Sequence, residues 1–234
     1  MATEEGRLRS VATEVKFMIE ASEGARIRDW ARQHLVADSY GGGPFGDEYR
    51  TTSLYFDTDQ RDVFHRRGSF GRSKHRIRRY GNSPDVFLER KLRLRDVVHK
   101  RRCRVPLADL TRLAHANGEW AGTWFDRRLK LRRLLPTCLI TYDRTARVLE
   151  VDGATVRLTI DDQVTGAPMD AVTFEASPGT PLLDGWMILE LKFRDHLPAI
   201  FRRLVEDYNL QAEPASKYRL TMSELGTKVQ AQTV

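Results

Sequence analysis

Charged side chains that could bind a polyanion occupy alternate positions in several separate segments of this sequence. Arg76 and Arg78 are separated by one isoleucine, and Glu190 and Lys192 are separated by one leucine. Arginine and lysine bind phosphate oxygens, whereas carboxylates can hold a divalent cation beside them. We therefore interpret these residues as candidates for a site that binds a phosphate-containing anion, with a metal ion held nearby.

The elements that must position these residues are β-strands. A strand sends successive side chains to opposite faces, so each segment would carry charge on one face. In 187–193 the other face is strongly apolar. One such strand would be an ordinary surface strand, but several of them predict one shared basic cavity. The strands expected from alternation and turn residues are 12–20, 50–57, 73–80, 85–93, 97–105, 138–149, 154–162 and 186–194.

Helical patterns are expected at about 22–36, 60–67, 107–116 and 122–134, and after Pro198. The predicted fold class is α+β: an antiparallel, eight-stranded barrel with a polar, basic lumen, surrounded by helices that cover the apolar strand faces. Nothing in the sequence separates two domains. We expect one domain over 12–225, with flexible ends at 1–11 and 226–234.

The composition also favours acidic partners. The chain of 234 residues has a formal net charge of +7, and 30% of its residues are charged. Its two cysteines and six scattered histidines form neither a disulfide framework nor a zinc motif. We expect a reduced, cytoplasmic location, because the sequence contains no signal peptide and no segment long enough to span a membrane.

Two basic segments allow other interpretations. The run 72–79 resembles a nucleic-acid patch, but only Phe70 and Tyr80 could stack on bases there, so nucleic acid is disfavoured as a partner. The basic helix at 127–133 would ordinarily be a solvated face. It could also be a docking surface for an acidic partner or product.

Several short motifs together resemble the VTC domain, the polyphosphate polymerase branch of the triphosphate tunnel metalloenzymes (CYTH-like superfamily). The motifs are EVKF, SLYFDT, RIRRYG, LERK, KRR, YDRTA, ILELKF and SKY, at 14–17, 53–58, 76–81, 88–91, 100–102, 142–146, 188–193 and 216–218. Each motif is weak alone. Their number and order across residues 12–225 make the joint resemblance specific.

The resemblance implies a tunnel that binds triphosphate or polyphosphate along its axis. The implied catalytic and phosphate-contacting residues are Lys16, Arg76, Arg78, Lys91, Arg144 and Lys217, with Ser216 as a further phosphate contact. Strand phase adds Lys100, Arg102 and Lys192 as lumen cations. The resemblance implies that Glu190 holds Mn²⁺ or Mg²⁺, and the shared strand faces make Glu14 and Glu89 further candidates for the metal.

Two positions depart from the patterns of these relatives. The hydrolases and cyclases of the superfamily carry Glu-x-Glu-x-Lys on the first strand, and here Ala12 replaces the first glutamate. This change disfavours thiamine triphosphatase or cyclase chemistry. VTC polymerases usually have a basic residue two positions before the serine of Ser-Lys, and here that position is Pro214. One end of the tunnel is therefore expected to hold phosphate less tightly.

The expected function is metal-dependent transfer of the γ-phosphate of ATP to polyphosphate. Hydrolysis of triphosphate or polyphosphate is the first alternative, and a polyphosphate-binding module without turnover is the second. The chain lacks the SPX domain and membrane segments of eukaryotic members, which leaves a membrane partner as an open possibility. Neither the preferred metal nor the oligomeric state follows from the sequence.

Overall fold

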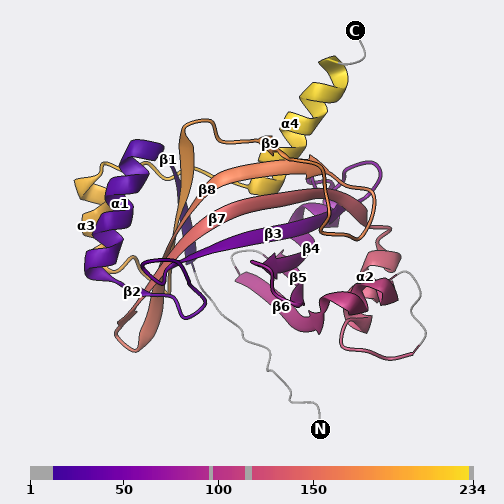
Figure 1. Ribbon diagram of the computed structural model, residues 1–234, viewed down its shortest axis with the longest axis horizontal. Coiled ribbons are helices and arrows are strands. Elements are labelled where there is room, and N and C mark those ends of the chain that lie inside the picture. Colours follow the sequence, from indigo (N-terminus) through magenta and orange to yellow (C-terminus); the bar gives the residue numbers. More distant parts are fainter. Residues whose placement is uncertain (1–12, 95–96, 114–117, 232–234) are drawn as a thin grey trace.

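A computed structural model describes residues 13–94, 97–113 and 118–231, and its largest element is one antiparallel sheet of ten strands (Figure 1). The strands are β1 Thr13–Glu20, β2 Val36–Ala37, β3 Glu48–Asp57, β4 Ser73–Tyr80, β5 Asp85–Leu94, β6 Val97–Pro106, β7 Leu135–Val151, β8 Ala154–Pro168, β9 Thr180–Pro181 and β10 Trp186–Phe193. Their order is β1-β10-β8-β7-β3-β4-β5-β6, with β2 on β7 and β9 on β8.

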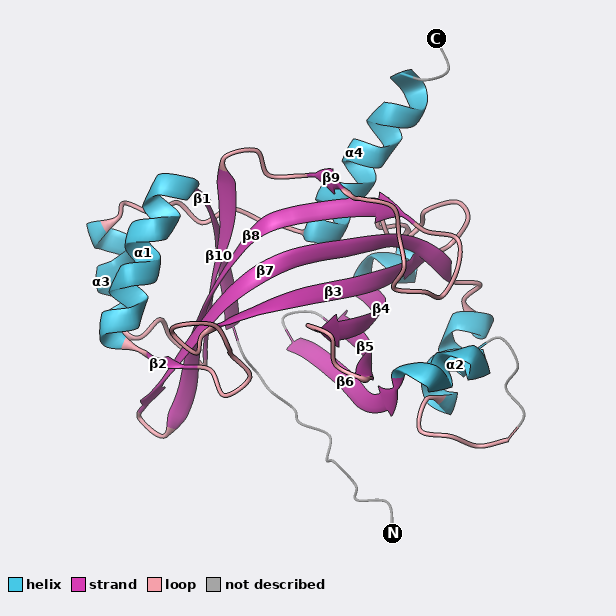
Figure 2. Cartoon of the chain, in the orientation of Figure 1, coloured by secondary structure: helices cyan, strands magenta, loops and turns pink. Residues whose placement is uncertain are grey.

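The sheet is strongly curved but open, so the expected closed eight-stranded barrel is not confirmed, although the α+β class is (Figure 2). Within the described residues, no backbone pairing joins β1 to β6 at the two ends of the strand order. A salt bridge instead connects Lys91 on β5 to Glu14 on β1, with 2.7 Å between Nζ and Oε2. Charged side chains, rather than backbone hydrogen bonds, therefore span the gap between the two ends.

Helices cover the apolar outer face of the sheet in two places. Helices α1 (Ala21–His34) and α3 (Ala199–Asp207) lie side by side at one end of the molecule (Figure 1). Ile27 from α1 and Phe201 from α3 are fully buried there against Leu158 and Leu189 of the sheet. This packing removes the apolar side of β1, β8 and β10 from water and leaves their charged side on the inner face.

The second core lies behind β3, β4, β5 and β7. Leu54, Ile77 and Leu88 of the sheet are fully buried in it together with Phe125 of α2 (Thr123–Leu131). Tyr218 of α4 (Lys217–Ala231) is buried in the same cluster. The helices therefore cover the apolar strand faces, as the alternation predicts.

Several segments differ from the pattern expected from sequence. Residues 60–67 form turns, because the carboxylate of Asp57 accepts hydrogen bonds from the backbone N–H groups of Val63 and Phe64. The segments Gly68–Arg72 (η1) and Leu107–Leu113 (η2) are 3-10 helices. Strands β7 and β8 are longer than predicted and meet at Asp152-Gly153, where both residues have positive φ, as a tight hairpin turn requires.

The ends of the domain are described only in part. Residues 1–12, which include the expected start of the domain at position 12, and residues 232–234 lie outside the described residues. Helix α4 continues through 226–231, beyond the expected boundary at 225. In the described part of the chain, no helix is both long enough and apolar enough to cross a membrane.

Candidate functional site

The register of the sheet brings the predicted charged residues onto one inner face. Lys16 lies directly opposite Glu190, and Arg144 lies directly opposite Asp161. Glu89 lies between Arg76 and Arg102 on the neighbouring strands. Because directly opposed residues share a face, the same registers and strand alternation extend this set across the sheet. The inner-face cations are Lys16, Lys74, Arg76, Arg78, Lys91, Lys100, Arg102, Arg104, Arg144, Arg157 and Lys192.

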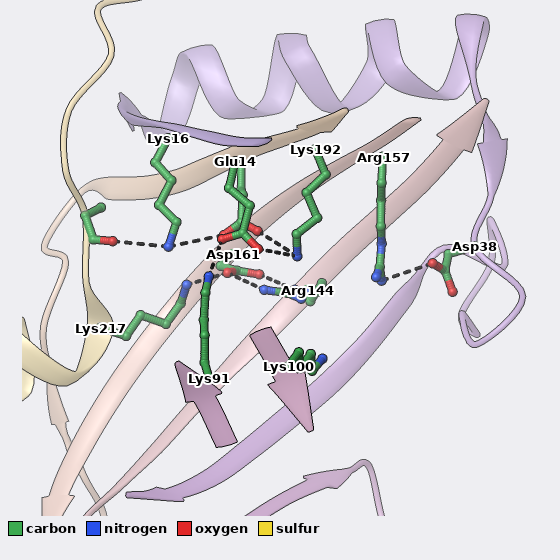
Figure 3. A network of polar contacts seen from close by, with 12 residues as sticks. Glu14, Lys16, Asp38, Lys91, Lys100, Arg144, Arg157, Asp161, Lys192 and Lys217 are labelled. Carbon is green, nitrogen blue, oxygen red and sulfur yellow. Dashed lines mark hydrogen bonds and ion pairs between the residues drawn. The ribbon is translucent and has the colours of Figure 1, made fainter. Parts of the chain in front are cut away.

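A first group of inner-face residues surrounds Glu14, which Figure 3 labels, and the neighbouring Glu190. The Nζ atom of Lys192 lies 3.1 Å from an oxygen of each carboxylate. Lys16 Nζ lies 3.2 Å from Glu190, and Lys91 reaches Glu14 from the other end of the sheet. Burial opposes ionisation of Glu190, but the ammonium groups of Lys192 and Lys16 outweigh it and hold its pKa well below the usual range. Both carboxylates are therefore anions at neutral pH.

A second group is centred on Asp161, whose side chain is fully buried. Arg144 donates two hydrogen bonds to it, at 2.6 Å from Nε and 2.8 Å from Nη2. Lys217, the first residue of α4, donates a third to the same carboxylate. Burial alone would favour the protonated acid, yet Arg144 and Lys217 lower the pKa of Asp161 far below its ordinary value. Asp161 thus fixes two cations of the inner face in position.

A third group surrounds Glu89, which is 2% exposed. Its carboxylate lies 2.7 Å from the guanidinium of Arg76 and 3.2 Å from both Lys100 Nζ and Arg102 Nε. Three cations therefore share one carboxylate. Arg78, on the same strand as Arg76, has no carboxylate partner among the described residues and instead donates to hydroxyl groups of Ser53 and Tyr142, both at 3.0 Å.

Arg79 does not share the inner face with Arg76 and Arg78, because neighbouring residues of a strand point to opposite faces. It lies on the other face of β4, where it donates hydrogen bonds to the carbonyl oxygens of Ser83 and Asn82 in the turn that follows. The run 72–79 is therefore split between two faces and does not form a continuous basic surface.

Ser216 and Lys217 reach the inner face from the start of α4. Ser216 Oγ accepts a hydrogen bond of 2.8 Å from Lys74 Nζ. Beside them is a cavity of about 590 Å³, lined by residues that include Pro214, Lys16 and Glu14. Arg66 and Arg219 line the same cavity. Cations thus remain available at this end of the site, although Pro214 occupies the position where a basic residue was expected.

Three inner-face residues, Asp161, Lys74 and Arg157, were not predicted from the sequence. Strand alternation could have identified all three. Polar residues at 157, 159 and 161 alternate with the apolar Leu158 and Ile160, and Lys74 precedes Arg76 by two residues. Arg157 Nη2 lies 3.0 Å from Asp38, but its Nε atom is buried without a hydrogen-bond partner, as is Thr159 Oγ1.

The described inner-face cations outnumber the carboxylates that pair with them, and unused hydrogen-bonding groups remain. These carboxylates are Glu14, Asp38, Asp85, Glu89, Asp161 and Glu190. Crowding of cations in a confined site is costly unless an anion neutralises them. The arrangement is therefore suited to an extended anion with many oxygen acceptors.

Comparison with known proteins identifies the family. A family model for the VTC domain matches residues 11–225 of this chain. The chain belongs to the VTC-domain family. The resemblance deduced from short motifs is thus confirmed over nearly the whole described structure. A search of curated proteins found no match.

Solved structures similar to this VTC domain share its fold at low sequence identity. A candidate adenylate cyclase from Bacillus halodurans is 13% identical, with a TM-score of 0.55, over 87% of this chain and 92% of that chain. A candidate adenylyl cyclase from Hippeastrum, which has a dominant triphosphatase activity, is also 13% identical, with a TM-score of 0.51. The match covers 90% of this chain and 95% of that chain. The fold is that of the CYTH-like, triphosphate tunnel proteins.

The donor set of this VTC domain can accommodate a divalent metal ion only in part. Among the described residues there is no group of three or more His, Cys, Asp or Glu side chains placed to hold a metal. Glu14 and Glu190 do share Lys192, so two carboxylates lie close together. Mg²⁺ is commonly held by one or two carboxylates together with substrate phosphates, so this pair fits a metal that arrives with its substrate.

The pKa values of Lys74 and Tyr55 predict that triphosphate affinity falls as the pH rises. Burial and the nearby Lys16 and Lys91 lower the pKa of Lys74 to about 8. Burial opposes ionisation of Tyr55, but Arg76 and Arg78 lower its pKa to about 8. Burial also lowers the pKa of Lys100 to about 8. Above that pH Lys74 and Lys100 each lose a positive charge and Tyr55 gains a negative one, and all three changes disfavour an anion.

Calorimetric titration with tripolyphosphate between about pH 7 and pH 9.5 should show roughly tenfold weaker binding at the higher pH. The double variant Lys74→Gln/Tyr55→Phe should show a flatter profile, because neither replacement titrates in this range. If the affinity of that variant fell with pH as steeply as that of the wild-type protein, groups other than Lys74 and Tyr55 would be responsible for the pH dependence.

Proposed function

We propose that this VTC domain is a polyphosphate polymerase, which transfers the γ-phosphate of ATP to the end of a polyphosphate chain. A terminal oxygen of the chain attacks the γ-phosphorus and forms the new P–O bond. The bond between the γ-phosphorus and the β,γ-bridging oxygen breaks, and ADP leaves with that electron pair. The attacking oxygen is already anionic, so the reaction requires no Ser-His-Asp arrangement.

The observation that carries this proposal is the excess of cations on a single concave face. A phosphoryl-transfer enzyme acts mainly by aligning the two phosphate groups and neutralising their charge. In this proposal Lys16, Arg76, Arg78, Lys91, Arg144 and Lys217 position the reacting phosphates. Lys100, Arg102, Lys192 and Ser216 bind the rest of the chain. Asp161 and Glu89 hold several of these cations in place before the substrate enters.

Glu190, together with Glu14, would hold Mn²⁺ or Mg²⁺. Such an ion neutralises phosphate charge and polarises the phosphoryl group when it is bound. Glu89 shares no cation with these two glutamates in the ion pairs of the described residues. A metal at Glu89 would therefore be a separate ion, and we propose Glu89 primarily as a counter-ion for Arg76.

Hydrolysis of triphosphate is the second candidate function, and the triphosphatase activity of the Hippeastrum structure with this fold favours it. The same residues would then align water rather than a phosphate oxygen. Incubation with ATP and Mn²⁺, followed by separate assays for polyphosphate and free phosphate, distinguishes the two reactions. Long-chain product supports the polymerase, and free phosphate released from tripolyphosphate supports the hydrolase. Binding without either product would leave only a polyphosphate-binding module.

Binding at this site should also stabilise the fold. Tripolyphosphate at about 100 times its dissociation constant should add roughly 2.7 kcal/mol to the free energy of unfolding and raise the Tm accordingly. The rise should shrink at high salt, because it depends on charge. Differential scanning fluorimetry with millimolar tripolyphosphate at low salt measures this effect. A Tm unchanged under those conditions would contradict a phosphate site on the inner face.

A further inference from the structure

A second group of cations lies on the outer face of the sheet, away from the proposed catalytic site. Arg90 on β5 lies directly opposite Arg101 on β6. Helix α2, which packs against β5, brings Arg128 close to them, and Arg132 follows at the end of this helix. Like charges directly opposite each other on neighbouring strands destabilise a sheet. The fold therefore holds four arginines together at a cost in free energy.

Two of these guanidinium groups are held in place by aromatic rings. The guanidinium of Arg101 lies over the ring of Trp124, 4.4 Å from its centroid. That of Arg132 lies 4.0 Å from the centroid of Phe70, and its Nη2 donates a 3.1 Å hydrogen bond to Ser69 Oγ. A guanidinium over the face of an aromatic ring is held in position, while its N–H groups can still donate hydrogen bonds. These contacts pre-organise the arginines for an anion.

The cluster has hydrogen-bonding groups that the described protein atoms do not satisfy. Arg90 Nε is buried without an acceptor. His75, directly opposite Arg90, is 1% exposed, and neither of its ring nitrogens has a partner. Among the ion pairs of the described residues, none involves Arg90, Arg101, Arg128 or Arg132. Burial, with Arg128, Arg101 and Arg132 nearby, also lowers the pKa of Arg90, as expected where cations face one another.

We propose that Arg90, Arg101, Arg128 and Arg132 form a second binding site, on the outer face, for an oligophosphate. Several fixed guanidinium groups suit a compact ligand with several adjacent anionic groups. Nucleic acid is a poorer fit, because guanidinium groups cover the rings of Trp124 and Phe70 that could otherwise stack on bases. This site requires no turnover and is separate from the inner face.

The test uses two neighbouring arginines of α2 as a matched pair. Arg127 and Arg128 are both exposed, but of the two only Arg128 is among the cations whose charge lowers the pKa of Arg90. Calorimetric titration of the whole protein with tripolyphosphate, in about 0.1 M salt, should resolve two binding events per chain. Arg128→Glu should weaken the outer-site event at least about tenfold, whereas Arg127→Glu, with the same change in charge, should alter it less than about twofold.

Equal losses in the two variants would overturn the proposal, because they would indicate general attraction to a basic surface. A single binding event in the wild-type protein that is insensitive to Arg128→Glu would overturn it as well. Failure of the inner-face site is separable, because the wild-type protein would then show a single binding event that Arg128→Glu weakens and Arg144→Gln leaves unchanged.

Vesicles containing phosphatidylglycerol provide the remaining arm of the test. If Arg128→Glu abolished vesicle binding while tripolyphosphate binding remained intact, the cluster would be a membrane contact and the oligophosphate proposal would be wrong.

Discussion

Replacement of Arg76 or Arg78 with alanine is expected to weaken tripolyphosphate binding by roughly 10- to 150-fold, since a hydrogen bond to a charged group contributes about 1.5–3 kcal/mol. Both guanidinium groups lie on the inner face, where Arg78 is 5% exposed and, among the described residues, donates its side-chain hydrogen bonds to hydroxyl groups. A phosphate oxygen can therefore become the principal counter-charge of Arg78. Calorimetric titration of each variant at low salt measures the loss.

Arg79 is the matched control for this prediction. It is the residue after Arg78 on the same strand, carries the same charge and donates hydrogen bonds to the carbonyl groups of the turn. Arg79→Ala should change the affinity by less than about twofold. Equal losses in all three variants would instead indicate a surface patch of the kind that binds nucleic acid. Arg76→Gln, with the Tm measured for each variant, separates lost binding from lost folding.

The second large effect is expected for Glu190→Gln, which should reduce metal-dependent turnover by at least about 100-fold, or roughly 2.7 kcal/mol of barrier. The replacement keeps the size of the side chain but removes the charge that a metal ion requires. It also frees Lys16 and Lys192 from their shared carboxylate. Without metal, tripolyphosphate affinity should therefore stay the same or increase, which distinguishes a metal role from damage to the phosphate site.

Glu206→Gln provides the control for the loss of one carboxylate, because Glu206 is exposed on α3, outside the inner face. Its activity should match that of the wild-type protein. Turnover of Glu190→Gln within about threefold of wild type at saturating Mn²⁺ would contradict the metal role of Glu190.

The sequence by itself determined the phase of the charged strands. Alternation has a period of two, so the type and position of each residue are enough to place Arg76 with Arg78 and to separate both from Arg79. The same local pattern placed Lys16, Lys91 and Lys192 on charged faces. The order of short motifs also identified the VTC-domain family, because motif order is a property of the chain and needs no tertiary contact.

Only the tertiary structure decided which charges neutralise one another. Glu14 and Lys91 are 77 positions apart, and Lys217 is 56 positions from Asp161. Such pairs depend on how far the sheet curves and where α4 begins, and both depend on packing of the whole core. For the same reason the sequence could not show that the sheet remains open between β1 and β6. Periodicity assigns a side chain to a face, but the distance across a cavity depends on the whole fold.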